Sequence, residues 1–157
     1  MPTVSILVDV QNIYYTTRDQ YHRHFDYNAF WAQVMQGRTL VQANAYAIAR
    51  SDEKQKQFHN ILRGIGFEVK LKPYIQRHDG SAKGDWDVGI ALDAIELAET
   101  SDVIVIASGD GDFELLAKRI QQRFGKKVEV YGVPELTANS LIEAADSFHP
   151  IKDDLLL

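Results

Sequence analysis

The chain has 157 residues, of which 45% are hydrophobic, and these values are ordinary for one globular domain with a real core. Its formal net charge of −5 argues against a generic basic coat for nucleic acid, although an acidic metal cluster in a nucleic-acid enzyme would itself supply several of these charges. The absence of cysteine excludes disulfides and thiolate metal sites.

The sequence carries no signal for a membrane or for export. Residues 1–4 form no basic segment, and no apolar run approaches ~18 residues. We therefore expect a cytoplasmic protein with no membrane partner. Without repeats, low-complexity tracts or linkers, the chain is expected to form a single domain over residues 1–157, with a core of about 3–148 and a short, loosely held tail. The oligomeric state is not indicated.

Strands and helices alternate along the chain. Apolar, often β-branched runs that end at turn residues predict five strands, and these cover 3–9, 40–49, 67–72, 102–107 and 127–131. Apolar residues at helical spacing predict helices between them, and these begin near Asn12, Asp26, Asp52, Asp85, Asp112 and Leu136. Residues 75–84 are polar and rich in turn formers, so a mobile loop is expected there. The alternation predicts an α/β fold with a mostly parallel sheet covered on both faces.

The most informative segment is 108–112 (Ser-Gly-Asp-Gly-Asp), which follows the apolar strand 102–107 directly. Asp110 and Asp112 therefore lie at the carboxyl end of a core strand, where ligands bind in an open α/β sheet. Two acids this close repel each other unless a cation lies between them, and hard cations such as Mg²⁺ or Mn²⁺ prefer carboxylate oxygens. The alternative is that Asp112 caps the next helix and Asp110 is a solvated turn residue. Asp9, at the end of the first strand, favours the metal site.

A third acidic element lies in the segment 83–93 (Lys-Gly-Asp-Trp-Asp-Val-Gly-Ile-Ala-Leu-Asp). Asp85 and Asp87 fall in the first turn of an expected helix, where the helix dipole favours negative charge. We expect Asp85 to be the N-cap, while Asp87, about 200° further round the helix, could face the strand-end acids. Asp93 lies well off the face of Asp87, and it could either support the site from behind its ligands or be a polar surface position.

These elements, in this order, resemble the NYN domain, a branch of the PIN-like nuclease superfamily in which the LabA-like group is nearest. The resemblance rests on 9–12 (Asp-Val-Gln-Asn), 83–93 and 108–113, continues in the closing segment 136–148, and covers roughly residues 3–148. It implies a Rossmann-like three-layer α/β/α sandwich with a five-stranded sheet of order 3-2-1-4-5. That order places the first and fourth strands side by side, so that the acids at their ends converge.

The same resemblance implies a catalytic and metal-binding set, which consists of Asp9, Asn12, Asp87, Asp110 and Asp112. The family usually has Lys-Gly-Val-Asp-Val where this chain has the longer Lys-Gly-Asp-Trp-Asp-Val, so either Asp85 or Asp87 could be the metal-facing acid. We choose Asp87, because Asp87-Val88 and the later Asp93 keep the family's spacing. Ser108 could bond a ligand oxygen or shape the loop.

This residue set suits the hydrolysis of a phosphodiester bond with the help of Mg²⁺ or Mn²⁺. We predict a metal-dependent ribonuclease, and the resemblance alone implies that the substrate is RNA. The alternative is an RNA-binding or regulatory module that keeps the acidic pocket but has little or no turnover. A phosphatase of the aspartyl-phosphate type matches poorly, because the position two residues after Asp9 is Gln11.

A negative cavity needs a positive rim to admit RNA, which we expect to be single-stranded. Lys72, Arg77 and Lys83 lie on or beside the loop 75–84, and we expect them to contact phosphates. A second basic group, which includes Lys126 and Lys127, is better explained as a solvated surface.

Three aromatic residues flank the acidic elements. Trp86 could stack on a base, but packing at a helix start is the stronger expectation. Tyr14 and Tyr15 follow Asp9 closely, and one of them could border the cleft. The histidines show no ligand spacing, and His59 is expected at the surface.

Overall fold

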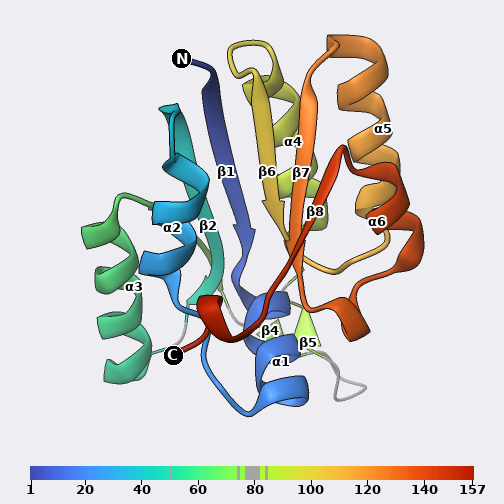
Figure 1. Ribbon diagram of the computed structural model, residues 1–157. Coiled ribbons are helices and arrows are strands. Elements are labelled where there is room, and N and C mark those ends of the chain that lie inside the picture. The colour runs from blue at the N-terminus through green and yellow to red at the C-terminus, as the bar shows by residue number, and fades with distance from the viewer. Residues whose placement is uncertain (50, 74, 77–81, 84) are drawn as a thin grey trace.

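The computed structural model describes residues 1–49, 51–73, 75–76, 82–83 and 85–157 (Figure 1). The first half of the chain forms β1 (Thr3–Asp9), α1 (Val10–Tyr21), α2 (Tyr27–Met35), β2 (Thr39–Ala49), α3 (Glu53–Ile65), β3 (Glu68–Pro73), β4 (Ile75–Gln76) and β5 (Ala82–Lys83). The second half forms α4 (Asp87–Ala98), β6 (Val103–Ala107), α5 (Phe113–Phe124), β7 (Lys127–Gly132), the 3₁₀ turn η1 (Pro134–Leu136), α6 (Asn139–Ala144), β8 (Ser147–Pro150) and the 3₁₀ turn η2 (Asp153–Leu155).

Six strands form one parallel sheet of order β3-β2-β1-β6-β7-β8. The first five in this order are the strands expected from the sequence, and their predicted arrangement is confirmed. The expected loop 75–84 contains a short antiparallel pair instead, in which Ile75 on β4 lies opposite Lys83 on β5. The rest of that loop lies outside the described residues.

Helices cover both faces of this sheet, which gives the expected α/β/α sandwich (Figure 1). The side chains of β1 alternate between the two cores: Ile6 and Val8 pack under α1 to α3, whereas Leu7 packs under α4 to α6. On β6, Val105 and Ile106 alternate in the same way. Both faces of the central strands are buried, and this is why they read as continuous apolar runs.

The end of the chain is packed, against the expectation of a loose tail. β8 adds to the edge of the sheet, with Phe148 opposite Val130 on β7. After it, Ile151, Leu155 and Leu156 are all buried in the core under α1 to α3. The expectation failed because β8 is too short to stand out as an apolar run, and the apolar residues after it are separated by charged ones.

The expected helices are present, and most begin within two residues of their predicted starts. α4 begins at Asp87, two residues after the predicted cap at Asp85. His59 on α3 is buried with an exposed fraction of 4%, so its expected surface position is wrong. It lies three residues before the buried Leu62 and so shares the core face of that helix. None of the helices in the described ranges is long and apolar enough to span a membrane.

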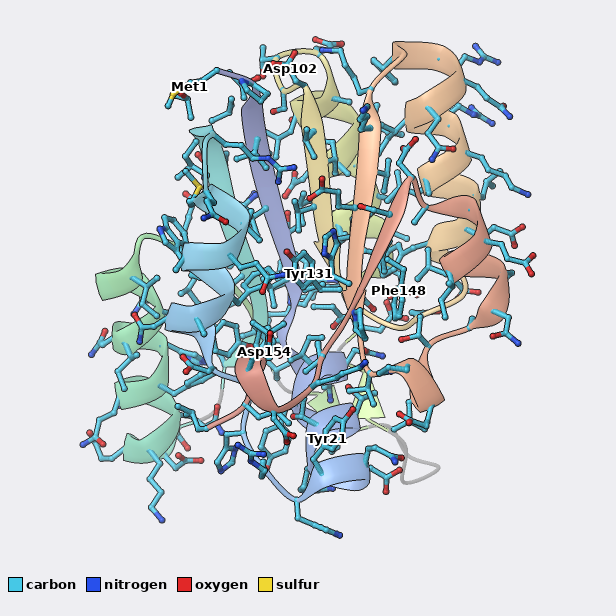
Figure 2. The ribbon with its side chains drawn as sticks, in the orientation of Figure 1. Met1, Tyr21, Asp102, Tyr131, Phe148 and Asp154 are labelled. Carbon is cyan, nitrogen blue, oxygen red and sulfur yellow. The ribbon has the colours of Figure 1, made fainter. Side chains whose placement is uncertain are left out.

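The carboxyl ends of all six strands gather at one end of the molecule, because the strands are parallel. Tyr21, at the end of α1, lies toward this end, whereas Met1 and Asp102 lie at the opposite end of the sheet (Figure 2). α1 to α3 follow β1 and β2 on one face, and α4 to α6 lie on the other. The neighbours β1 and β6 therefore meet where the connections change face, which is where ligands bind in such folds.

Candidate metal centre

The ends of β1 and β6 lie side by side in the middle of the sheet. Val8 on β1 pairs with Ala107 on β6, so the next residues, Asp9 and Ser108, lie side by side at the carboxyl ends of the two strands. The Ser108 hydroxyl donates to Oδ2 of Asp9 at 3.3 Å. Oδ1 of Asp9, the N-cap of α1, accepts from the N–H of Asn12 at 3.4 Å. The Asp9 carboxylate is thus held by the first turn of α1 and by the residue that follows β6.

The loop 108–112 is shaped by its own polar groups. The N–H of Asp110 donates to Oγ of Ser108 at 3.2 Å, and the N–H of Asp112 donates to Oδ1 of Asp110 at 2.9 Å. Asn12 ties this loop to α1, because its side-chain oxygen accepts from the N–H of Gly109 at 2.9 Å. Asn12 and Ser108 therefore fix the positions of the acids.

The segment 136–138 supports the same loop from outside. The N–H of Ala138 donates to the backbone oxygen of Gly109 at 3.1 Å. A Cβ at Gly109 would lie 2.6 Å from the backbone oxygen of Leu136, and one at Gly111 would lie 2.9 Å from Cβ of Ala138. Glycine is needed at both positions because only a backbone without Cβ can approach this closely.

Trp86 fixes the start of α4. Its indole N–H donates to the backbone oxygen of Ala47 on β2 at 2.8 Å, and its ring lies against Gly89, where a Cβ would be 2.6 Å from the ring. Oδ1 of Asp85 accepts the N–H of Asp87 at 2.8 Å. Asp85 therefore satisfies a first-turn N–H, as expected of a cap, although Trp86 occupies the N-cap position itself.

Three carboxylates from two helix starts converge on one point. Asp87, Asp110 and Asp112 each offer an oxygen, and these oxygens lie within 4.8 Å of one another. They border a pocket of about 330 Å³, which is lined by Asp9, Gln11, Asn12, Tyr15, Asp85, Trp86, Asp87, Asp110 and Asp112. The predicted acids from all three sequence elements are thus brought to the same pocket.

Burial and neighbouring negative charges change the protonation of Asp9 and Asp87. Burial raises the pKa of Asp9 to about 6, and the charges of Asp110 and Asp85 act in the same direction, while hydrogen bonds from Asn12 and Ser108 oppose it. The pKa of Asp87 is raised to about 7, first by burial and then by the hydrogen bond and charge of Asp110. Without a cation, the pocket therefore retains protons near neutral pH.

A hard divalent cation fits this donor set. Mg²⁺ and Mn²⁺ take carboxylate oxygens, and three such oxygens are already close together. Within the described residues, the salt bridges formed by lysine, arginine or histidine involve other acids. Asp112 is at the N-cap of α5, yet its carboxylate makes no capping hydrogen bond to the part of the chain that the structure describes. It remains available to a ligand.

Asp93 lies outside this pocket. Its Oδ2 accepts from the Tyr46 hydroxyl at 2.7 Å and from Nζ of Lys70 at 2.8 Å. These contacts link α4 to β2 and β3 in a second, polar pocket that Gln42 and Asn44 also line. The sequence left open whether Asp93 supports the site, and the structure places it with the sheet instead.

The structure describes the three expected RNA-binding cations to different extents. Nζ of Lys72 lies 4.4 Å from the centre of the Trp86 ring and donates to the backbone oxygen of Asp85 at 3.0 Å, so it is at the edge of the pocket. The backbone of Lys83 is on β5. Arg77 lies outside the described residues.

Sequence reasoning missed Gln11 as part of the pocket and left Tyr14 and Tyr15 undecided; the structure places Tyr15 in the lining. Asn12 and Tyr15 are three residues apart on α1, which places them on one helix face. That spacing was the available signal for choosing Tyr15 as the residue that borders the cleft.

Residues 3–152 match the family model described as NYN domain. The chain belongs to the NYN domain family. It is 28% identical over 120 residues to the Low amplitude and bright protein LabA of Synechococcus elongatus, an alignment that covers 73% of this chain and 64% of that protein. This similarity supports placing the chain in the LabA-like group of the family. The chain spans less than two thirds of the length of that relative.

Two solved structures are similar to this NYN domain. A crystal structure of a protein of unknown function from Vibrio parahaemolyticus shares 63% sequence identity with a TM-score of 0.95, and covers 99% of this chain and 96% of that chain. A carbohydrate kinase from Agrobacterium tumefaciens shares 13% identity with a TM-score of 0.52, over 94% of this chain and 60% of that chain. The second likeness concerns the fold alone.

Proposed function

We propose that this protein is a divalent-metal-dependent ribonuclease that hydrolyses single-stranded RNA. The observation that carries the proposal is the convergence of Asp87, Asp110 and Asp112, whose oxygens lie within 4.8 Å of one another beside the partly buried Asp9. The NYN family lies within the PIN-like nuclease superfamily, and this membership supports nuclease chemistry at such a site.

In this proposal, the residues divide between holding the ion and shaping the pocket. Asp87, Asp110 and Asp112 would hold Mg²⁺ or Mn²⁺, with Asp9 completing the set directly or through water. A bound ion of this kind lowers the pKa of a bound water and stabilises charge on a phosphate. Asn12 and Ser108 keep the strand-end loops together through Gly109 and Asp9.

Asp85 has a different proposed role from Asp87. It lines the shared pocket, but its Oδ1 is already engaged by the N–H of Asp87. We therefore assign Asp85 to positioning the start of α4. The Asp85→Asn variant keeps the acceptor oxygen, so it should retain much more cleavage than Asp87→Asn.

The proposed RNA path begins at Lys72, a described cation at the edge of the pocket. Arg77 and Lys83 are proposed to continue it, on the basis of their positions in the sequence. Mutating all three to alanine should weaken RNA binding and reduce its salt slope, by roughly 0.7 for each phosphate of a single strand that is no longer neutralised. An unchanged slope would exclude this path.

The second candidate function is an RNA-binding or regulatory module with little or no turnover. Such a module would have the same acidic pocket and the same bound metal ion as a ribonuclease. Only a measurement of turnover therefore separates these two functions. The test is cleavage of an end-labelled single-stranded RNA with Mn²⁺ or Mg²⁺, with and without EDTA, by wild type, Asp9→Asn and Asp110→Asn. The exposed Asp19 on α1 supplies the matched control Asp19→Asn.

If the protein is a ribonuclease, wild type and Asp19→Asn should cleave the RNA, and EDTA should inhibit both. The cleavage rates of Asp9→Asn and Asp110→Asn should be at least about 100-fold lower although both variants remain folded. Equal rates in all four proteins would identify the activity as a contaminant. RNA binding without cleavage under every metal condition would support the regulatory module.

A further inference from the structure

An exposed aromatic group lies next to the acidic pocket on α1. Tyr14 and Tyr15 have exposed fractions of 41% and 42%, and within the described ranges they are the phenylalanine, tyrosine or tryptophan side chains that are most open to solvent. Their rings meet edge to face with centres 5.5 Å apart. Aromatic rings contribute most to stability when buried, so two adjacent exposed rings suggest a binding role.

Arg18 joins the two rings into one surface. Its guanidinium carbon lies 5.3 Å from the centre of the Tyr14 ring and 5.2 Å from that of Tyr15. The exposed His24 extends this surface, because its ring is stacked on that of Tyr14 with centres 6.1 Å apart. We call Tyr14, Tyr15, Arg18 and His24 the tyrosine platform.

The platform continues directly from the acids. Tyr15 itself lines the acidic pocket, together with Asp9 and Asn12 from the start of the same helix. From Asp9 to Arg18 the helix rises by about 14 Å, which is the length of about four stacked nucleotides at 3.4 Å each. A strand whose phosphate lies at the acids would therefore have its neighbouring bases within reach of the rings.

We infer that the tyrosine platform binds the unpaired bases of a single-stranded nucleic acid beside the acidic pocket. The inference rests on the proposed function for the choice of RNA as the ligand. Bases stack on aromatic rings regardless of sequence, and a nearby arginine strengthens such a surface. Bases in a duplex are already paired and stacked inside the helix, so the platform selects single strands.

Stacking also suits the charge of this protein. The net charge of −5 and the acids of the pocket disfavour binding that depends on phosphate contacts alone. Binding that depends on base stacking is much less sensitive to salt, and Arg18 supplies a single phosphate contact. Removing the rings and removing the cation should therefore have different signatures.

The test measures binding of a short single-stranded RNA that contains 2-aminopurine, whose fluorescence falls when it stacks. Every protein carries Asp110→Asn, so that the RNA stays intact. The platform predicts strong quenching with the parent protein. Tyr15→Leu and Tyr14→Leu should each abolish quenching and weaken affinity about tenfold, while Tyr15→Phe keeps both. Arg18→Gln should reduce the salt slope by roughly 0.7.

The control is Ile61→Ala, which removes an exposed apolar side chain from α3, and it should bind like the parent. Unchanged affinity and quenching in both leucine variants would overturn the platform, and so would equal affinity for duplex and single-stranded RNA. These results are independent of turnover. A wild-type protein that binds through the tyrosines but never cleaves RNA would contradict the ribonuclease and leave the platform standing.

Discussion

Asp112 differs from the other aspartates that occupy the N-cap position of a helix in the described residues. The carboxylates of Asp9, Asp26 and Asp52 each accept a backbone N–H in the first turn of their helices. Asp112 occupies the same position on α5, but within the described residues its carboxylate makes no such bond. A helix cap typically contributes about 1 kcal/mol, and this stabilisation is missing at the start of α5, where Asp112 belongs to the acidic cluster. Its carboxylate is instead part of the proposed metal site.

The repulsion within the cluster predicts that Asp110→Asn stabilises the metal-free protein. Asparagine keeps the Oδ1 that accepts the N–H of Asp112, while one negative charge is removed. The melting temperature without metal should rise by about 2–4 °C, which corresponds to roughly 1 kcal/mol for a domain of this size. Differential scanning calorimetry in EDTA measures this shift.

Mn²⁺ should then raise the melting temperature of wild type by mass action and raise that of Asp110→Asn much less. The control Asp19→Asn should respond to Mn²⁺ like wild type. If Asp110→Asn instead melts lower in EDTA and responds normally to Mn²⁺, Asp110 is a structural loop residue.

At the scale of elements, the start of α4 is held by Trp86 more than by a cap. Its indole N–H bonds to Ala47 on β2, and its ring contacts Gly89 and lies 5.2 Å from the ring of Tyr46. The sequence predicted packing for Trp86 as the stronger alternative, and these contacts confirm it. Because Asp87 is the next residue, the anchor determines where its carboxylate lies.

Trp86→Phe tests this positioning role. Phenylalanine keeps most of the packing but cannot donate to Ala47, so the free energy of unfolding should fall by about 1–2 kcal/mol. Mn²⁺ affinity, measured by calorimetric titration of the folded protein, should fall several-fold as the start of α4 loosens. Val88→Ala, at a neighbouring side chain with an exposed fraction of 71%, is the control and should leave affinity unchanged. Normal Mn²⁺ affinity in Trp86→Phe would show that the anchor contributes to stability only.

Local sequence signals located the helices and the three acidic elements, because caps, glycines and apolar periods are short-range features. They could not assign Asp93, whose partners Tyr46 and Lys70 come from strands 47 and 23 residues away. They also misplaced the end of the chain, since β8 is defined by its pairing with β7 and has little apolar pattern of its own. The sequence predicted least well the features that have no local pattern of their own and are defined only by a long-range contact.

At the scale of the whole molecule, the order of the strands assembles the site. β1 and β6 are separated by more than ninety residues in the sequence, yet they are neighbours at the centre of the sheet. The resemblance to the NYN domain implied this order, and periodicity alone would not have given it. Strand adjacency then brings Asp9 to the loop that carries Asp110 and Asp112.

The raised pKa values of Asp9 and Asp87 predict how stability depends on pH without metal. The folded protein holds protons that the unfolded chain releases above its ordinary aspartate pKa of 3.8, so their stabilising effect is complete below that pH. It is lost as the pH rises through about 6 and 7. Burial lowers the pKa of His59 and works in the opposite direction, but it does so equally in wild type and variants.

We therefore compare the stability of wild type and Asp87→Asn in EDTA, measured by thermal unfolding from pH 5 to pH 8. Wild type should lose stability relative to the variant as the pH rises, because only wild type must ionise Asp87. In excess Mn²⁺ the trend should reverse, since the ion binds the ionised carboxylates. Parallel curves in EDTA would contradict the crowding of Asp87 with the other acids.

Anomalous X-ray scattering from crystals grown with Mn²⁺ shows whether the acidic cluster is a divalent-cation site. We predict an anomalous peak within about 2.5 Å of carboxylate oxygens of Asp87, Asp110 and Asp112, and its disappearance in crystals of Asp110→Asn. A well-ordered pocket without a peak at saturating Mn²⁺, or a peak that is unchanged in Asp110→Asn, would contradict a cation site formed by these carboxylates.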